Sequence, residues 1–206
     1  MRKTKIYIPI EINKRELDSL LLFSIFASKQ NFSVVLSTKQ NLNSSLNYLK
    51  SGIYLMKSIG KKNFKFIKNL KKKGHKIVCL DIEGSHYIHK EKLINRVHLN
   101  NLNELEYFFC WGKNQKKDLT NLYPSQAKKL KVTGHPKVDI LKKSLNGIYK
   151  QEAAKIKKDY GKFILITTFF PVYNFFKRQN VLSHTQMLKH ADYVGPNLTL
   201  LGKHLL

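Results

Sequence analysis

Acidic residues are scarce in this sequence. Among its 206 residues, 38 Lys and Arg stand against 13 Asp and Glu, which gives a formal net charge of +25. Such an excess favours an anionic partner, meaning nucleic acid, a phospholipid surface or a phosphorylated substrate. The chain is also crowded with Lys, Asn and Ile, as an AT-rich coding sequence would produce, and its lysines are spread along its whole length. We therefore attribute most of the charge to composition and part of it to contact with a membrane.

Cysteines are nearly absent as well. The sequence holds only Cys79 and Cys110, each inside an apolar run. Their separation does not suit a metal site, and two isolated apolar cysteines are typical of buried, reduced thiols in a cytoplasmic protein. His86 and His89 have a His-x-x-His spacing but no evident third ligand, so the sequence predicts no metal site there either.

Long hydrophobic runs are missing too. The longest apolar helical stretch, residues 20–27, is far shorter than the ~20 residues that a membrane-spanning helix needs. The apolar run near the N-terminus is interrupted by Pro9 and Glu11, which does not fit a signal peptide. We therefore expect a cytoplasmic protein that does not cross the membrane and that can rest on its inner face through a basic surface.

Several motifs with known chemistry are also absent. The sequence contains neither the Gly-x-x-x-x-Gly-Lys loop of many nucleotide-binding proteins nor the Gly-x-Gly-x-x-Gly fingerprint of dinucleotide-binding folds, and it has no serine nucleophile elbow. Helix-turn-helix, zinc-finger and RNA-recognition signatures are lacking, so we expect no specific nucleic-acid partner. A basic nucleic-acid-binding module stays an alternative on the strength of the charge alone.

What the sequence does contain is an alternation of short apolar segments with helical periodicity. Extended segments are predicted before residue 13 and at 31–37, 52–55, 76–81, 107–112, 131–134 and 163–167. Helices are predicted at 13–29, 42–49, 59–73, 114–122, from 135 onward and at 151–160. This alternation is typical of an α/β fold, which we expect to be a Rossmann-like parallel sheet with helices on both faces.

The order of the elements also predicts the domain organisation. Residues 1–148 are expected to form one Rossmann-like domain, and 149–161 a linker helix. The strand at 163–167 would begin a second Rossmann-like domain over 162–206. The residues after that strand are too few for an independent core of ordinary size, so we expect the second domain to be incomplete in this chain.

Charged residues gather where predicted strands end. Glu11, Arg15 and Glu16 lie where the first strand meets the first helix, and Asp81 and Glu83 follow a buried strand. Open α/β sheets bind their ligands outside the carboxyl ends of the strands. These five side chains are therefore candidates for a shared site.

Three segments carry a resemblance to a known family. They are Ile8-Pro9-Ile10-Glu11 with Arg15-Glu16-Leu17-Asp18-Ser19, the acidic strand end Leu80-Asp81-Ile82-Glu83-Gly84, and the block Val132-Thr133-Gly134-His135-Pro136-Lys137-Val138-Asp139-Ile140-Leu141. Together they resemble the N-terminal half of surface carbohydrate biosynthesis proteins, over roughly residues 4–170. These are capsule- and lipopolysaccharide-type glycosyltransferases with two Rossmann-like domains, the GT-B architecture. The third block is similar to the family's Gly-x-Pro-x-x-Asp segment near the domain hinge.

The resemblance has consequences for function. It implies that the N-terminal domain binds a sugar acceptor, which can be lipid-linked. The second domain would make most of the contacts with a nucleotide-activated sugar donor, and no other cofactor is expected. Because most of that domain is missing, we expect the chain to need a C-terminal half, in cis or in trans. A nucleotide-sugar epimerase, a polyol-phosphate transferase and a functionless gene product stay alternatives.

Three carboxylates are candidates for the general base that inverting sugar transfer requires: Glu11, Glu16 and Glu83. A capping role competes at Glu16. If Asn13 is the N-cap of the first helix, Glu16 lies at N3 and completes a capping box. Glu11 has no equally evident structural role, and turn chemistry competes with function at Glu83.

Arg15, Asp81, Gly134 and His135 are predicted to contact the substrate. Arg15 lies four positions after Glu11 and can hold that carboxylate or bind a phosphate as a fork. Asp81 ends a strand at a site position. Gly134 and His135 precede a proline and predict a tight turn and a helix start, whose N-terminus can hold an anion. For His135, a capping or surface role competes.

Overall fold

The computed structural model describes residues 3–85, 87 and 92–166. The chain divides into two units after Gln151, and each is described by itself. The first unit contains a six-stranded sheet in which every neighbouring pair of strands is parallel. Its strands are β1 (Lys5–Ile10), β2 (Ser33–Thr38), β3 (Ile53–Met56), β4 (Lys76–Leu80), β5 (Tyr107–Cys110) and β6 (Leu130–Val132).

The strand order is β2-β1-β3-β4-β5-β6. The chain leaves β1 for one edge of the sheet and then returns past it to β3, so the direction of winding reverses between β1 and β3. This is the flavodoxin-like order, and it differs from the dinucleotide-binding order, which begins 3-2-1. In such sheets the crevice at the reversal, beyond the carboxyl ends of the strands, is where ligands bind.

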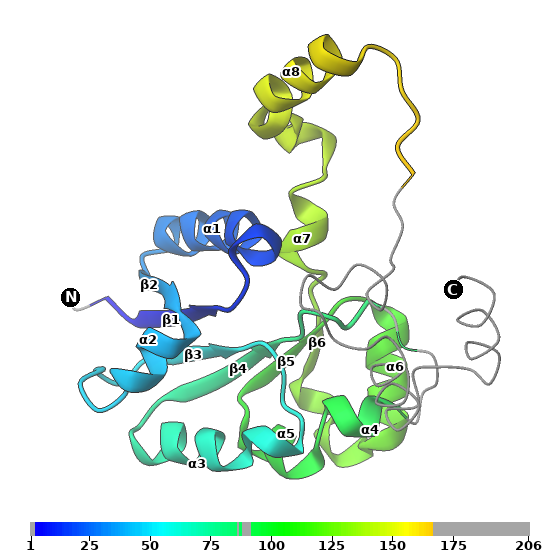
Figure 1. Cartoon of the computed structure of the whole chain (residues 1–206). Helices are drawn as coiled ribbons and strands as arrows, with labels where there is room; N and C mark the ends of the chain where they lie inside the picture. The colour runs from blue at the N-terminus through cyan, green and yellow to red at the C-terminus, as the bar shows by residue number, and fades with distance from the viewer. Residues whose placement is uncertain (1–2, 86, 88–91, 167–206) are drawn as a thin grey trace, which may run out of the picture. The chain divides into compact units, whose positions relative to one another are not determined.

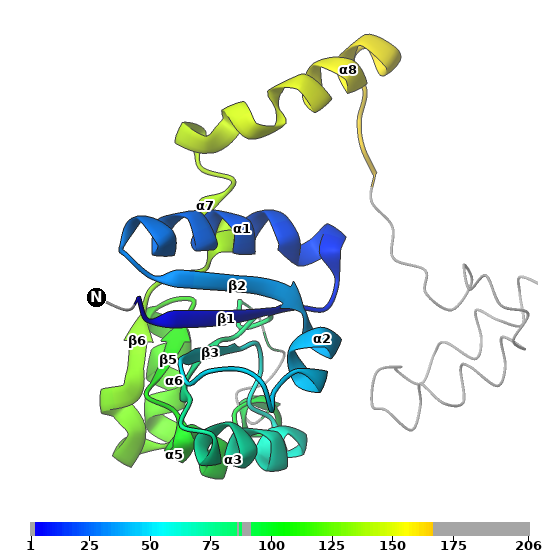
Figure 2. The same ribbon diagram turned by 90° about the vertical axis from the view of Figure 1, so that its left-hand side faces the viewer.

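Helices cover both faces of the sheet, which confirms the predicted α/β class (Figure 1). One face carries α1 (Asn13–Lys29), with α7 (Pro136–Asp139) beside it. Figure 2 shows α1 lying along β1 and β2, with α3 (Phe64–Lys72) and α5 (Leu99–Glu104) on the opposite side. In the part of this unit that the structure describes, the other helical segments are α2 (Lys39–Ser44), η1 (Lys61–Asn63), α4 (Leu93–Arg96), α6 (Lys113–Leu122), η3 (Pro124–Lys129) and η4 (Lys143–Tyr149).

The two faces have separate hydrophobic cores because successive side chains of a strand point in opposite directions. On β1, Ile6, Ile8 and Ile10 pack with Leu20 of α1. Tyr7, between them in sequence, belongs to the other core, which is the larger of the two. All four β1 side chains are buried, which is typical of a parallel sheet covered on both sides.

Most sequence predictions of the elements are confirmed within a few residues. The helix at 13–29 matches α1 in both bounds, and Gly74 ends α3 with a φ of 77°. The helices α4 and α5 were not predicted, because neither is long enough to show a clear helical period. Both cysteines are free and buried, as expected.

The second unit is described only in part. The helix α8 (Lys150–Tyr160) matches the predicted linker helix, and residues 163–166 form no strand. Thr167 and the rest of the predicted second domain lie outside the described residues, so that domain stays a prediction. Among the described residues, no helix combines the length and the apolar character needed to cross a lipid bilayer.

Candidate functional site

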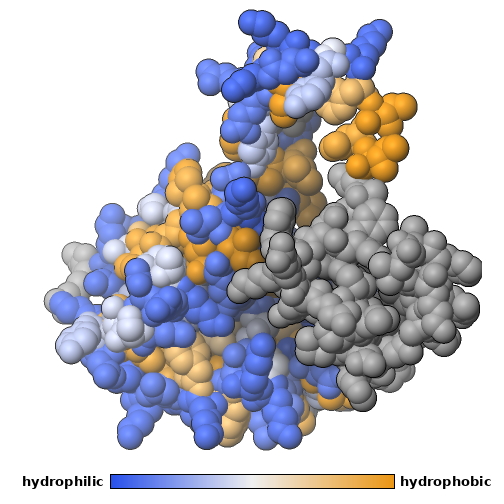
Figure 3. Space-filling view, in the orientation of Figure 1, coloured by the Kyte–Doolittle hydropathy of each residue, from blue (hydrophilic) through white to orange (hydrophobic). Residues whose placement is uncertain are grey.

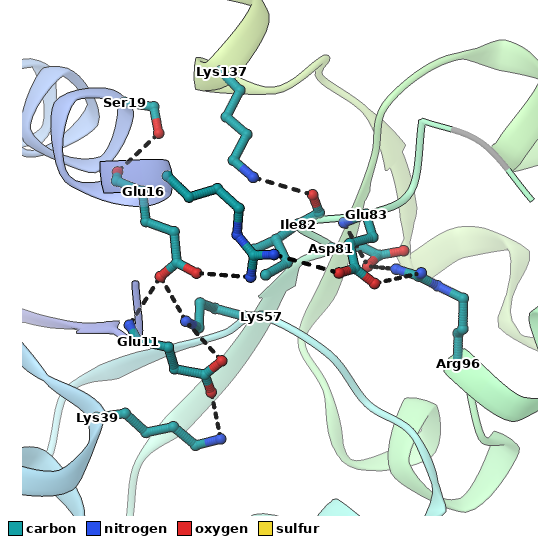
Figure 4. Close-up of polar contacts among 11 residues, drawn as sticks. Glu11, Glu16, Ser19, Lys39, Lys57, Asp81, Ile82, Glu83, Arg96 and Lys137 are labelled. Atoms are coloured by element: carbon teal, nitrogen blue, oxygen red, sulfur yellow. Dashed lines mark hydrogen bonds and ion pairs between the residues drawn. The ribbon is translucent and has the colours of Figure 1, made fainter. Parts of the chain in front are cut away.

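Charged side chains from three strand ends and one helix converge at the carboxyl edge of the sheet (Figure 4). Glu11 follows β1, Lys57 follows β3, and Asp81 follows β4. Arg15 and Glu16 come from the first turn of α1. The reversal between β1 and β3 therefore brings Glu11 and Lys57 together, at the position where this strand order forms its crevice.

Glu16 lies at the centre of the group. Its Oε2 accepts from the backbone N of Glu11 at 2.9 Å and from Lys57 Nζ at 2.7 Å, and its Oε1 lies 3.4 Å from Arg15 Nη2. The side chains of Glu16 and Lys57 are only 1% and 7% exposed. Burial raises the pKa of Glu16, but the donors from Glu11, Lys57 and Arg15 together outweigh it, and the pKa ends below its ordinary value. Glu16 is held as a buried anion.

The capping-box interpretation of Glu16 is wrong. The N-cap of α1 is Ile12, which has extended backbone angles and no side-chain cap, and Asn13 is already the first helical residue. Glu16 is thus at N4. Its carboxylate reaches back to the backbone N of Glu11, the residue before the N-cap, and also to Lys57 after β3, so it joins the helix start to two strand ends.

Glu11 belongs to the same group of charged side chains, but its own side chain is partly exposed to solvent. Its Oε1 lies 2.5 Å from Lys39 Nζ and its Oε2 lies 3.3 Å from Lys57 Nζ. Burial raises the pKa of Glu11, but the hydrogen bonds and charges of the two lysines outweigh it and lower the pKa. Of the two roles considered for Arg15, the pairing with Glu11 does not occur, because Arg15 turns toward Glu16 and Glu83 instead.

Asp81 forms the second part of the site. Its Oδ1 accepts from Arg96 Nη2 at 2.5 Å, and its Oδ2 accepts from Gln115 Nε2 at 3.2 Å. The side chain is almost fully buried. Burial raises the pKa of Asp81 above its ordinary value, and the charge and hydrogen bond of Arg96 only partly offset this effect.

Glu83 connects the two parts and is the most accessible carboxylate of the group, with 55% of its side chain exposed. Arg96 Nη1 donates to its Oε2 at 3.0 Å, and its Oε1 lies 3.9 Å from Arg15 Nη1. A cavity of about 290 Å³ opens here. Its charged lining residues are Glu11, Arg15, Lys57, Lys62, Glu83 and Arg96.

Lys137 adds a further cation from α7. Its Nζ lies 3.5 Å from the carbonyl oxygen of Ile82, between the two strand-end carboxylates Asp81 and Glu83 in sequence. Burial, followed by the charge of Arg15, lowers the pKa of Lys137.

Gly134 and His135 have structural roles at the start of α7. Gly134 has a φ of 75°, a conformation that favours glycine, and so permits the turn before α7. His135 is the N-cap of α7: its Nδ1 accepts from the backbone N of Lys137 at 3.1 Å. Its buried ring stacks on Trp111, with the ring centroids 4.3 Å apart. Burial lowers the pKa of His135 to about 4, so the ring is neutral near pH 7.

Trp111 ties this segment to Asp81. Its indole Nε1 donates to the backbone oxygen of Asp81, and its backbone N donates to Gln115 Oε1 at 2.8 Å. Gly84 is packed so closely against this pair that an added Cβ would come within 2.4 Å of Gln115 Nε2 and 2.6 Å of Trp111 Cδ1. Close packing against Trp111 and Gln115 therefore accounts for a glycine at position 84.

The structure brings together five of the seven predicted site residues, namely Glu11, Arg15, Glu16, Asp81 and Glu83. Gly134 and His135 contribute instead to the turn and the N-cap that begin α7, which carries Lys137. Sequence reasoning missed five cations: Lys39, Lys57, Lys62, Arg96 and Lys137. Lys57 carried a usable signal, because it directly follows an apolar extended segment, as Asp81 does.

No group of three or more His, Cys, Asp or Glu side chains with a metal-binding arrangement occurs in the described part of the chain. His86 and His89 lie outside it. The mixture of accessible carboxylates and cations at the site instead suits a ligand that has both a hydroxyl to be deprotonated and a phosphate to be held.

No protein-family model, curated protein or solved structure matches this chain. Its function is therefore inferred from the residues and their geometry.

Proposed function

We propose that this chain is the acceptor-side domain of a glycosyltransferase of bacterial cell-surface polysaccharide biosynthesis, with the GT-B architecture. The observation that supports this most directly is the 290 Å³ cavity at the carboxyl edge, where two solvent-accessible carboxylates lie among four cations. Sugar transfer needs a base for the acceptor hydroxyl and positive charge for the leaving phosphate. The segments quoted above add the resemblance to that family.

Glu83 is the best candidate for the base. Glu16 is buried, and its carboxylate is occupied by three donors. Each oxygen of Glu11 faces a lysine, which lowers the pKa of Glu11 and weakens it as a base. Among the described residues, Glu83 Oε1 has a contact with Arg15 at 3.9 Å and no closer one, so this oxygen can accept a proton from a sugar hydroxyl in the cavity.

Arg15, Lys57 and Arg96 are proposed to hold the phosphate. A guanidinium donates two parallel hydrogen bonds, which suits phosphate oxygens, and both arginines line the cavity. Lys57 is held in place by Glu16 and contributes a fixed charge. The donor itself would be a nucleotide-activated sugar, bound mainly by a second domain supplied in cis or in trans.

The test is a transfer reaction with the chain, its second domain, a panel of nucleotide-activated sugars and lipid-linked acceptors, read by mass spectrometry. Glu83→Gln is expected to lower the rate by ~10²–10⁴-fold. Glu106→Gln is the matched control, since Glu106 is similarly exposed and pairs with Lys71 outside the cavity. It should leave the rate unchanged.

The products distinguish the alternatives. A new glycosidic bond supports the proposal. An epimerised nucleotide sugar or a phosphodiester-linked polyol would replace it with one of the other two chemistries. Absence of any product, together with tight and sequence-selective retention of nucleic acid at physiological salt, would overturn it in favour of a nucleic-acid-binding module.

A further inference from the structure

The helix α1 is apolar on two opposite sides. Leu20 and Ala27 are buried against the sheet, as a core-facing helix requires. Leu21, Ile25 and Phe26 point the other way and are 47%, 48% and 57% exposed. A surface helix normally places polar residues on its outer side, so this outer side is unusual.

The segment that packs beside α1 extends the apolar surface. Val138 of α7 and Leu141, just after it, are more than half exposed. The helix α7 packs against α1. Tyr149, in η4, also connects to α1, because its hydroxyl donates to Asp18 at 2.9 Å. We refer to Leu21, Ile25, Phe26, Val138 and Leu141 as the α1–α7 patch. Figure 3 shows hydrophobic surface over these two elements, bordered by hydrophilic residues.

Basic residues are frequent in the two segments that carry the α1–α7 patch. Residues 13–29 and 136–150 contain seven Lys and Arg and three Asp and Glu. Arg15 and Lys137 turn to the carboxyl edge of the sheet, and the other five are Lys14, Lys29, Lys142, Lys143 and Lys150. Of those three acids, Glu16 is buried and ion-paired, Asp18 accepts from Tyr149, and Asp139 pairs with Lys142 at 2.6 Å. Lys29 extends its Nζ over the ring of Phe26, 5.9 Å from the centroid. The segments that carry the patch thus have an excess of cations and little free negative charge.

We propose that the α1–α7 patch is a docking surface for an anionic lipid membrane. Exposed apolar side chains of this extent mark interaction sites. Those of the patch can enter the boundary between headgroups and acyl chains, while the surrounding lysines remain at the anionic headgroups. A second copy of the chain is a poor occupant, because each copy carries a formal charge of +25 and the patch would meet another basic surface. This inference does not rest on the chemistry proposed for the carboxyl edge.

The experiment is sedimentation of the full chain with vesicles of phosphatidylcholine, either alone or mixed with phosphatidylglycerol. Binding is expected only to the mixed vesicles and should weaken as salt is raised. The triple variant Leu21→Ser, Ile25→Ser, Phe26→Ser should reduce binding by about 10-fold or more, because apolar burial is lost while every charge is kept. Ile94→Ser with Leu99→Ser is the matched control, since both residues are exposed and lie in α4 and α5.

A second measurement reports directly on whether the α1–α7 patch contacts the lipid. A polarity-sensitive fluorophore on Ser28→Cys, which is exposed on α1, should shift to shorter wavelength when mixed vesicles are added. The same label on Ser125→Cys, exposed in η3, should not shift. The native cysteines do not interfere, because both are buried.

Three results would overturn the proposal. The first is no binding to mixed vesicles at low salt. The second is binding that the triple variant retains in full, which would show that charge alone is responsible. The third is a triple variant that leaves lipid binding unchanged but dissociates an oligomer in analytical ultracentrifugation, which would assign the patch to a second copy. Thermal unfolding of each variant confirms that the fold is intact.

Discussion

Glu16 and Asp81 are both buried carboxylates at the carboxyl edge of one sheet, yet their environments affect them in opposite directions. Around Glu16, donors from Glu11, Lys57 and Arg15 outweigh burial and lower the pKa. Around Asp81, burial outweighs Arg96 and raises the pKa. The half of the site between β1 and β3 is therefore a fixed arrangement of charges, whereas the half after β4 has a carboxyl group that is less strongly held as an anion. Pairing alone does not decide ionisation, since the number of donors and the depth of burial matter together.

The largest effect is expected from Lys57→Met. It leaves Glu16 as a buried anion without its main partner, a change that typically costs about 3–5 kcal/mol in the free energy of unfolding. Urea unfolding at pH 7 measures it. The double variant Glu16→Gln, Lys57→Met should recover much of the loss. Lys39→Met is the control, because Lys39 is exposed and Glu11 is its ion-pair partner among the described residues; it should cost less than about 1 kcal/mol. Equal losses for Lys57 and Lys39 would contradict the comparison.

The next largest effect is a change of stability with pH at His135, on the side of the site where burial dominates the pKa values. Burial lowers the pKa of His135 to about 4, while the unfolded chain binds a proton near pH 6.5. Its contribution to stability is therefore fully present above about pH 6.5 and is lost as the pH falls toward 4, by roughly 3 kcal/mol. His135→Asn keeps a side chain suited to an N-cap and cannot titrate.

Unfolding free energies of the wild type and His135→Asn, measured across this pH range, test the prediction. The wild type should lose about 3 kcal/mol more than the variant between about pH 6.5 and 4. Burial also lowers the pKa of His75, but that residue is present in both proteins and cancels in the difference. Parallel pH profiles would show that His135 does not titrate in this way.

These residues also show what the sequence could predict. The alternation of elements predicted the parallel sheet, and the strand-end rule predicted that Glu11, Asp81 and Glu83 would share an edge. The partner of Glu16 was not predictable, because it depends on the strand order that places β3 next to β1. Arg96 lies in a four-residue helix without a sequence period. The burial of His135 depends on its stacking with Trp111, which comes from another strand end.

The third prediction compares the stabilities of two variants, Glu16→Gln and Asp81→Asn, in which a buried carboxylate is replaced by the corresponding amide. Glu16→Gln should cost about 2 kcal/mol at pH 7, because Lys57 then keeps only its contact with Glu11. Asp81→Asn should cost less than about 1 kcal/mol, since Arg96 retains Glu83 and the amide is not penalised by burial as a carboxylate is.

The pH dependence of the two amide variants should differ in sign. The contribution of Glu16, whose folded pKa is lowered, is present above its unfolded pKa and lost as pH falls. That of Asp81, whose folded pKa is raised, is present at low pH and lost as pH rises through the folded pKa. The cost of Glu16→Gln should thus shrink in acid, and that of Asp81→Asn should shrink as the pH is raised. Changes of the same sign in both variants would refute the assignment.

The smallest change in stability is expected at Glu83, which joins the two halves. Its carboxylate is largely exposed, and exposed ion pairs contribute only about 0–1 kcal/mol, so Glu83→Gln should leave the free energy of unfolding nearly unchanged. If Glu83 is the base, the same variant lowers the transfer rate by ~10²–10⁴-fold. Glu16→Gln should do the reverse, with a measurable loss of stability and, after correction for the fraction of folded protein, a smaller fall in rate than Glu83→Gln, because Glu16 only positions Lys57. A rate that follows the folded fraction in both variants would leave Glu83 as an exposed member of an ion-pair network, with the base to be sought at Glu11.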